Sequence, residues 1–284
     1  MFKGERKQDT NRKGRRFSRI RALAALMAVV MLLVQIVGAM PCERVSAEGD
    51  AADLRIVFTT DLHGQTTDVD YSKGVLFAKG GLTKAATLIK NARNEVPEGN
   101  TLLFDLGDVM YDYTTDYIYE TDESATQPIY MAMSKLNYDA IILGNHDYEY
   151  TLPYIQKQYE SSGLKDKVIA SNITDAVTGK HVFHENKIIE KTLKTSNGQS
   201  VTIKVGVIGE SIPTLSKKRC DYTGVLNGED MVANVRKETK ILKDAGADVV
   251  VVLAHSGVGS ENPALMDENV GYALTQIDGV DAVL

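Results

Sequence analysis

Residues 140–149 read AIILGNHDYE, a short apolar run that ends in a glycine followed by polar side chains. Such a run predicts a strand covered on both faces of a sheet. Three other stretches have the same form: RIVFTTDLHG (55–64), LLFDLGD (102–108) and VVVVLAHSG (249–257). Ligands bind at the carboxyl ends of strands in open α/β sheets, so we expect these four polar endings to meet in one region.

Strands and helices are expected to alternate along the rest of the chain. Apolar and β-branched runs predict strands at 54–60, 101–106, 140–143, 168–171, 201–208 and 249–254; helical spacing predicts helices at 81–94, 127–136, 152–161 and 230–245. Asn197-Gly198 lies between two strand-like runs and predicts a hairpin, which makes the sheet partly antiparallel. Residues 111–125 show no clear period and are predicted to form a long surface loop. The pattern indicates a layered α/β fold.

The polar strand endings supply candidate metal ligands, namely Asp61, His63, Asp108, Asn145 and His255. Carboxylate, amide and imidazole donors suit Mn, Zn, Fe or Mg better than a thiolate-bound ion. The chain has two cysteines, Cys42 and Cys220, too few for a cysteine-rich zinc site. One such ending is often only a turn, but four in this order favour a shared site with two ions about 3.5–4 Å apart.

On these motifs, which run from Asp61 to His255, the sequence resembles the calcineurin-like metallophosphoesterases, and within them the 5'-nucleotidase and 2',3'-cyclic-nucleotide phosphodiesterase branch. The resemblance implies a four-layered αββα sandwich with mixed sheets and two divalent ions, of Mn, Zn, Fe, Mg or Co. It implies that Asp61 and His63 bind the first ion and that Asp108 bridges both. Asn145 and His255 would hold the second ion.

The resemblance also implies that His146 is the catalytic histidine beside the phosphate. The branch has an acidic residue, usually Asp, four positions beyond the metal-binding Asn, which orients this histidine; here it is Glu149. Because Glu has one more methylene group than Asp, the distance or ring angle must differ. Asp147 is the competing partner, although its side chain should point away from His146 if the segment is extended.

The last strand expected from the sequence, at 280–284, is only beginning where the sequence stops. The family follows this strand with a Gly-His-x-His-like motif that completes both metal sites. We therefore expect the metallophosphoesterase domain over residues 48–284 to be incomplete, the C-terminal substrate-binding domain of the branch to be absent, and the chain as given to have little activity.

The N-terminal residues predict an export signal. Residues 1–21 hold nine Lys or Arg, residues 22–40 are uncharged and apolar, and Val45-Ser46-Ala47 has the small-x-small pattern of a cleavage site. Residues 1–47 are thus predicted to be a signal peptide. An uncleaved membrane anchor is the alternative, because about 19 apolar residues nearly span a bilayer. Either reading places the body outside the cytoplasm, whether periplasmic, cell-wall-associated or extracellular.

The body after residue 21 carries 23 basic and 36 acidic residues, a net charge of −13, which argues against a nucleic-acid polymer as partner. The resemblance implies instead a secreted or surface enzyme that hydrolyses nucleotides or other small phosphoesters with a hydroxide activated by two metals. Two alternatives stay open: a non-catalytic surface-binding module with the same fold, and another phosphatase of the superfamily. Metal content and a substrate panel would separate the three.

Overall fold

A computed structural model describes residues 51–70, 73–76, 80–215 and 219–284. The chain divides into residues 1–49 and 50–284, and every described residue belongs to the second unit. The predicted signal peptide, residues 1–47, lies outside the described residues. Within the described ranges no helix has the length and apolar character needed to cross a membrane.

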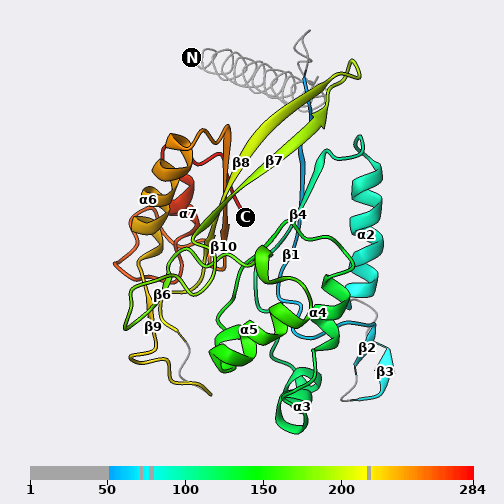
Figure 1. Ribbon diagram of the computed structural model, residues 1–284, viewed down its shortest axis with the longest axis vertical. Coiled ribbons are helices and arrows are strands. Elements are labelled where there is room, and N and C mark those ends of the chain that lie inside the picture. Colours follow the sequence, from blue (N-terminus) through cyan, green and yellow to red (C-terminus); the bar gives the residue numbers. More distant parts are fainter. Residues whose placement is uncertain (1–50, 71–72, 77–79, 216–218) are drawn as a thin grey trace, which may run out of the picture. The chain divides into compact units, whose positions relative to one another are not determined.

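The first sheet is parallel and has its helices on one face (Figure 1). Its strand order is β1 (Arg55–Thr59), β4 (Thr101–Asp105), β5 (Ala140–Ile141). Helices α2 (Leu82–Asn94), α4 (Pro128–Met133) and α5 (Leu152–Ser161) pack against this sheet. The buried cluster between them includes Leu103, Ile141, Tyr130 and Tyr159. The apolar spacing of the three helices therefore buries one face of each against the sheet.

The second sheet is mixed. Its order is β11 (Ala282–Val283), β10 (Val249–Ala254), β8 (Ser200–Glu210), β7 (Asn186–Lys194), and only the β7–β8 pairing is antiparallel. These two strands form the hairpin that Asn197-Gly198 predicts. Helices α6 (Met231–Asp244) and α7 (Gly271–Thr275) cover the sheet's outer face.

The inner faces of the two sheets meet in a common core. Leu102 and Phe104 of β4 share this cluster with Val205 and Val207 of β8 and with Leu253 of β10. Alternate residues of the same strands face the helices instead, as the two-residue period of a strand requires. The layers are thus helix, sheet, sheet, helix, which confirms the predicted four-layered αββα sandwich with mixed sheets (Figure 1).

Two expectations about secondary structure were wrong. The predicted loop at 111–125 contains helix α3 (Tyr113–Thr121), which begins at a capping box formed by Asp112 and Thr115. An Asp followed three residues later by Thr can satisfy two free N–H groups in the first turn of a helix. This local signal was present in the sequence, but the loop was predicted because residues 111–125 lack the apolar spacing of a helix. The predicted strand at 168–171 makes only isolated bridges, at Val168 and Ile169.

The remaining elements are short. They are the antiparallel pairs β2 (Val69–Asp70) with β3 (Val75–Leu76) and β6 (Ile173–Asp175) with β9 (Leu226–Gly228), and the 3-10 turns η1 (Asp147–Glu149) and η2 (Lys165–Lys167).

Gly209, on β8, faces Ile142 and Ile169 in the core between the two sheets. A Cβ atom there would lie 2.7 Å from Ile142 Cγ2 and 2.9 Å from Ile169 Cγ2. Gly209→Ala is expected to lower the free energy of unfolding by about 1–3 kcal/mol, because the added methyl overpacks the core. Denaturant unfolding of the purified protein measures this. Val201→Ala, at a 40% exposed position of the same strand, is the control, and equal midpoints for the two variants would contradict the prediction.

Candidate metal centre

The loops that follow β1 and β4 run side by side. Asp61 N donates to Gly107 O at 3.0 Å, His63 N to Asp108 O at 3.0 Å, and Gly64 N to Val109 O at 2.7 Å. These hydrogen bonds continue the pairing of the two strands beyond the sheet. They bring three predicted ligands, from two separate motifs, to one place.

The backbone of these loops is strained at the candidate ligands. Asp61, His63 and Asp108 have φ values of 52°, 43° and 55°, in the left-handed region that non-glycine residues rarely adopt. Such strain persists only where surrounding contacts enforce it, and it concentrates at functional sites. Gly144 makes the close approach possible, since a Cβ there would lie 2.1 Å from Asp108 Oδ1.

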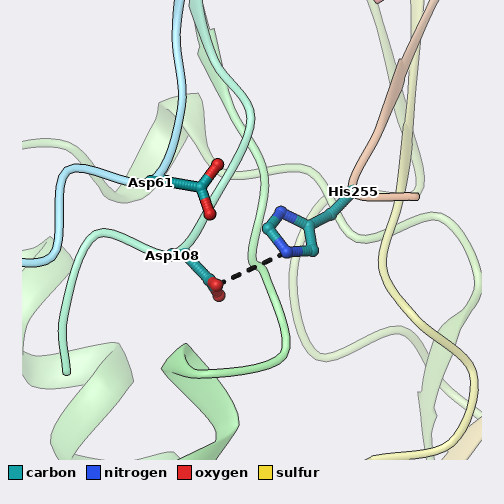
Figure 2. Close-up of side chains that lie close together, drawn as sticks. All are labelled: Asp61, Asp108 and His255. Atoms are coloured by element: carbon teal, nitrogen blue, oxygen red, sulfur yellow. Dashed lines mark ion pairs between the residues drawn. The ribbon is translucent and has the colours of Figure 1, made fainter. Parts of the chain in front are cut away.

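Asp108 lies at the centre of the candidate site. Its buried carboxylate accepts a hydrogen bond from His146 N through Oδ1 at 2.8 Å, while Oδ2 lies 3.5 Å from His255 Nε2 and 3.9 Å from His63 Nε2. Figure 2 shows Asp61, Asp108 and His255 converging from three loops. One ligand atom from each of these three lies within 4.8 Å of the other two. The group can therefore surround a cation.

Both predicted histidine ligands are oriented by main-chain carbonyls. His63 Nδ1 lies 3.1 Å from Met110 O, and His255 Nδ1 lies 2.8 Å from Leu106 O. A carbonyl oxygen only accepts, so Nδ1 carries the proton and Nε2 faces the carboxylates. This is the arrangement by which outer contacts prepare a histidine to bind a metal.

His255 also contacts Asn145, the remaining predicted ligand: His255 Nε2 lies 3.1 Å from Asn145 Oδ1. Burial lowers the pKa of His255, but the hydrogen bond and charge of Asp108 outweigh this effect and raise the pKa to about 9. A proton on His255 and a cation beside it thus compete for the same carboxylate, and metal binding would release that proton.

Asp147 points away from His146, as expected, but the reason is a short 3-10 turn rather than an extended segment. Its fully buried carboxylate accepts from the N–H groups of Asp108 and Gly144 at 2.9 Å and of Val109 and Met110 at 3.2 Å. Burial, and next the charge of Asp108, raise the pKa of Asp147 to about 7. Asp147 therefore holds the loop that carries Asp108. The sequence showed no sign of this, since three of its four partners lie 37–39 residues away.

Glu149 is the acidic residue that contacts His146. His146 Nδ1 lies 3.0 Å from Glu149 Oε1, and the Glu149 side chain is buried whereas the His146 side chain is 22% exposed. Turn η1 brings the two together across three residues. The structure thus places the other six predicted site residues in one connected group with Asp108. It adds Asp147 and Tyr111, whose ring stacks on His146 and whose role the sequence did not indicate.

A cavity of about 420 Å³ opens beside this group of residues. Asp61, His255, Thr60, Ser256 and Asn269 are among the residues that line it. The volume is in the range of small-molecule sites.

Known proteins resemble this chain in sequence and in fold. Residues 54–284 match the sequence model of the calcineurin-like phosphoesterases. The chain is 35% identical over 243 residues to a 2',3'-cyclic-nucleotide 2'-phosphodiesterase/3'-nucleotidase of Salmonella typhimurium, covering 84% of this chain and 37% of that protein. It is 27% identical over 208 residues to a 5'-nucleotidase of Vibrio cholerae, covering 72% of this chain and 34% of that protein.

Among solved structures, the calcineurin-like phosphoesterase YfkN from Bacillus subtilis superposes with a TM-score of 0.74 at 31% identity, covering 82% of this chain and 71% of that chain. The chain spans about 37% of the length of the Salmonella relative. Since the family match covers nearly all of the described residues and a solved member has the same fold, the chain belongs to the calcineurin-like phosphoesterase family.

Proposed function

We propose that this protein hydrolyses nucleotide phosphoesters with the help of two divalent metal ions, as a 5'-nucleotidase or a 2',3'-cyclic-nucleotide phosphodiesterase. The observation that carries the proposal is the buried Asp108 carboxylate, which lies within 4 Å of both His63 Nε2 and His255 Nε2. The names of the Salmonella and Vibrio relatives support the substrate class.

The donor set fits divalent cations. Carboxylate and amide oxygens with imidazole nitrogens suit Mn, Zn, Fe, Mg or Co, and both histidines keep Nε2 directed at the centre. In the proposal Asp61 and His63 hold one ion, Asn145 and His255 hold the other, and Asp108 serves both. When bound, such ions neutralise phosphate oxygens and lower the pKa of water.

We assign to His146 the role of assisting departure of the leaving group. Glu149 accepts a hydrogen bond from Nδ1, so Nε2 is the ring nitrogen left to act on the substrate, and the His146 side chain is 22% exposed. When the ring is doubly protonated, Nε2 can donate to a phosphate oxygen or pass its proton to the departing alkoxide. Asp147 contributes indirectly, by fixing the main chain on both sides of Asp108.

Metal removal tests the proposal. The full-length gene product, stripped with a chelator, should lose hydrolysis of nucleoside monophosphates and 2',3'-cyclic nucleotides and regain it on addition of Mn, Zn or Co, with about two ions bound per chain. Protein that was never exposed to chelator is the control. Full hydrolysis after complete metal removal would refute the proposal. A protein that takes up none of the added metals and hydrolyses neither substrate would favour a binding module.

A further inference from the structure

The ring of Tyr111 stacks on the imidazole of His146. The two ring centroids lie 4.1 Å apart and the planes differ by 15°. His146 is therefore held at Nδ1 by Glu149 and across one face by Tyr111, while the ring of His63 stands edge-on at 5.4 Å and 66°.

The main chain of Tyr111 is locked in an unusual conformation. Its φ is 84°, in the left-handed region that a bulky side chain disfavours. Its N–H lies 3.1 Å from both Tyr150 Oη and Thr115 Oγ1, and its carbonyl lies 3.2 Å from His63 Nδ1. These contacts maintain a strained backbone that presents the ring to His146.

Arg219 adds a further restraint on the phenol ring. Its guanidinium lies 6.0 Å from the Tyr111 centroid and 5.9 Å from the Tyr150 centroid, within reach of a cation–π interaction. Ion pairs with Asp116 and Glu120, both on α3, hold the guanidinium in turn. The ring of Tyr111 is thus fixed by its own backbone and by a neighbouring charged network.

One hydrogen bond does not fix the plane of an imidazole ring. The bond from Nδ1 to Glu149 sets one direction but allows rotation about it, and the terminal torsion of a Glu side chain has a broad minimum. A stacked ring removes that rotation, because offset-parallel aromatic pairs have a preferred separation and orientation.

We propose that Tyr111 is a positioning residue that fixes the plane of the His146 ring and so directs Nε2 at the substrate. The proposal rests on the role that the proposed function gives to His146. It assigns Tyr111 no contact with metal or substrate. In the proposal the side chain of Tyr111 affects the rate only through the orientation of His146.

Tyr111→Leu should lower kcat for nucleoside monophosphates about 10- to 100-fold, because errors of about 1 Å in placing a reacting group have effects of this size. KM and metal content should stay near those of the wild type. Tyr111→Phe keeps the stacked ring and should restore most of kcat. Tyr113→Leu, at a 65% exposed tyrosine two residues away, is the matched control. Equal turnover by the Leu and Phe variants, or loss of metal from the Leu variant, would overturn the proposal.

A double-mutant cycle separates positioning from a general structural effect. In a His146→Ala background, Tyr111→Leu should change kcat by no more than about twofold, since there is no ring left to orient. The full effect in that background would overturn the proposal.

The NMR signals of the His146 ring protons give a readout that needs no activity. They should be shifted upfield in the wild type and in Tyr111→Phe, and not in Tyr111→Leu. If the wild-type signals are shifted upfield but the metal-loaded wild type is inactive, the proposed function is refuted while the stacking of Tyr111 on His146 stands. If the wild-type signals are not shifted, the stacking itself is refuted.

Discussion

Asp108→Asn is expected to reduce phosphoester hydrolysis on the order of a thousandfold, because in the proposed site Asp108 would serve both ions and metal ions supply several kcal/mol of transition-state stabilisation. Asp108 Oδ1 accepts from His146 N, so the amide oxygen of Asn would take that place. The amide NH₂ would then face the Nε2 atoms of His63 and His255, now 3.9 and 3.5 Å from Oδ2. A donor there would oppose a cation, and bound metal should fall with activity.

Glu149→Gln is the matched control for this prediction, since it is the same carboxylate-to-amide change at another buried position of the site. The amide oxygen of Gln can still accept from His146 Nδ1, so only the charge of an orienting group is lost. We expect a decrease of about 10- to 100-fold with metal content unchanged. Steady-state kinetics and metal analysis of both variants make the comparison. Similar small losses would show that Asp108 is not the shared ligand.

His146→Ala is expected to lower kcat by about 10²- to 10⁴-fold, the range for loss of a general acid or base. Bound metal should remain, because no predicted ligand atom belongs to this side chain. If His146 protonates the leaving group, the loss should be largest for nucleoside monophosphates and small for p-nitrophenyl phosphate, whose leaving group needs little protonation.

The control for His146→Ala is His184→Ala. His184 is exposed and lines a different cavity, together with Phe183 and Lys165, so its replacement should not change kcat. Equal losses of kcat with both substrates would contradict leaving-group protonation, and a loss of metal from His146→Ala would place this side chain among the ligands.

Strands and helices were predicted correctly from local patterns where the apolar residues of a segment are numerous enough to form a buried face. The runs at 101–106 and 249–254 correspond closely to β4 and β10, and the helices predicted at 152–161 and 230–245 correspond to α5 and α6. Residues 168–171 were apolar enough to be buried but pair through isolated bridges only, since pairing depends on partners that a single run does not reveal.

By itself, the sequence determined which residues could form the site. Strand ends and glycine turns are local features, and Asp61, His63, Asp108, Asn145 and His255 follow them directly. Only the tertiary structure decided how the supporting residues divide their roles. Turn η1 sends Glu149 to His146 and Asp147 to the loop of Asp108, and the left-handed backbone of Tyr111 lays its ring on His146. The contact of Glu149 with His146 spans only three residues and was expected from the sequence. The contacts of Asp147 with Asp108 and of Tyr111 with His146 join residues more than 30 positions apart, and no local pattern of side chains encodes them.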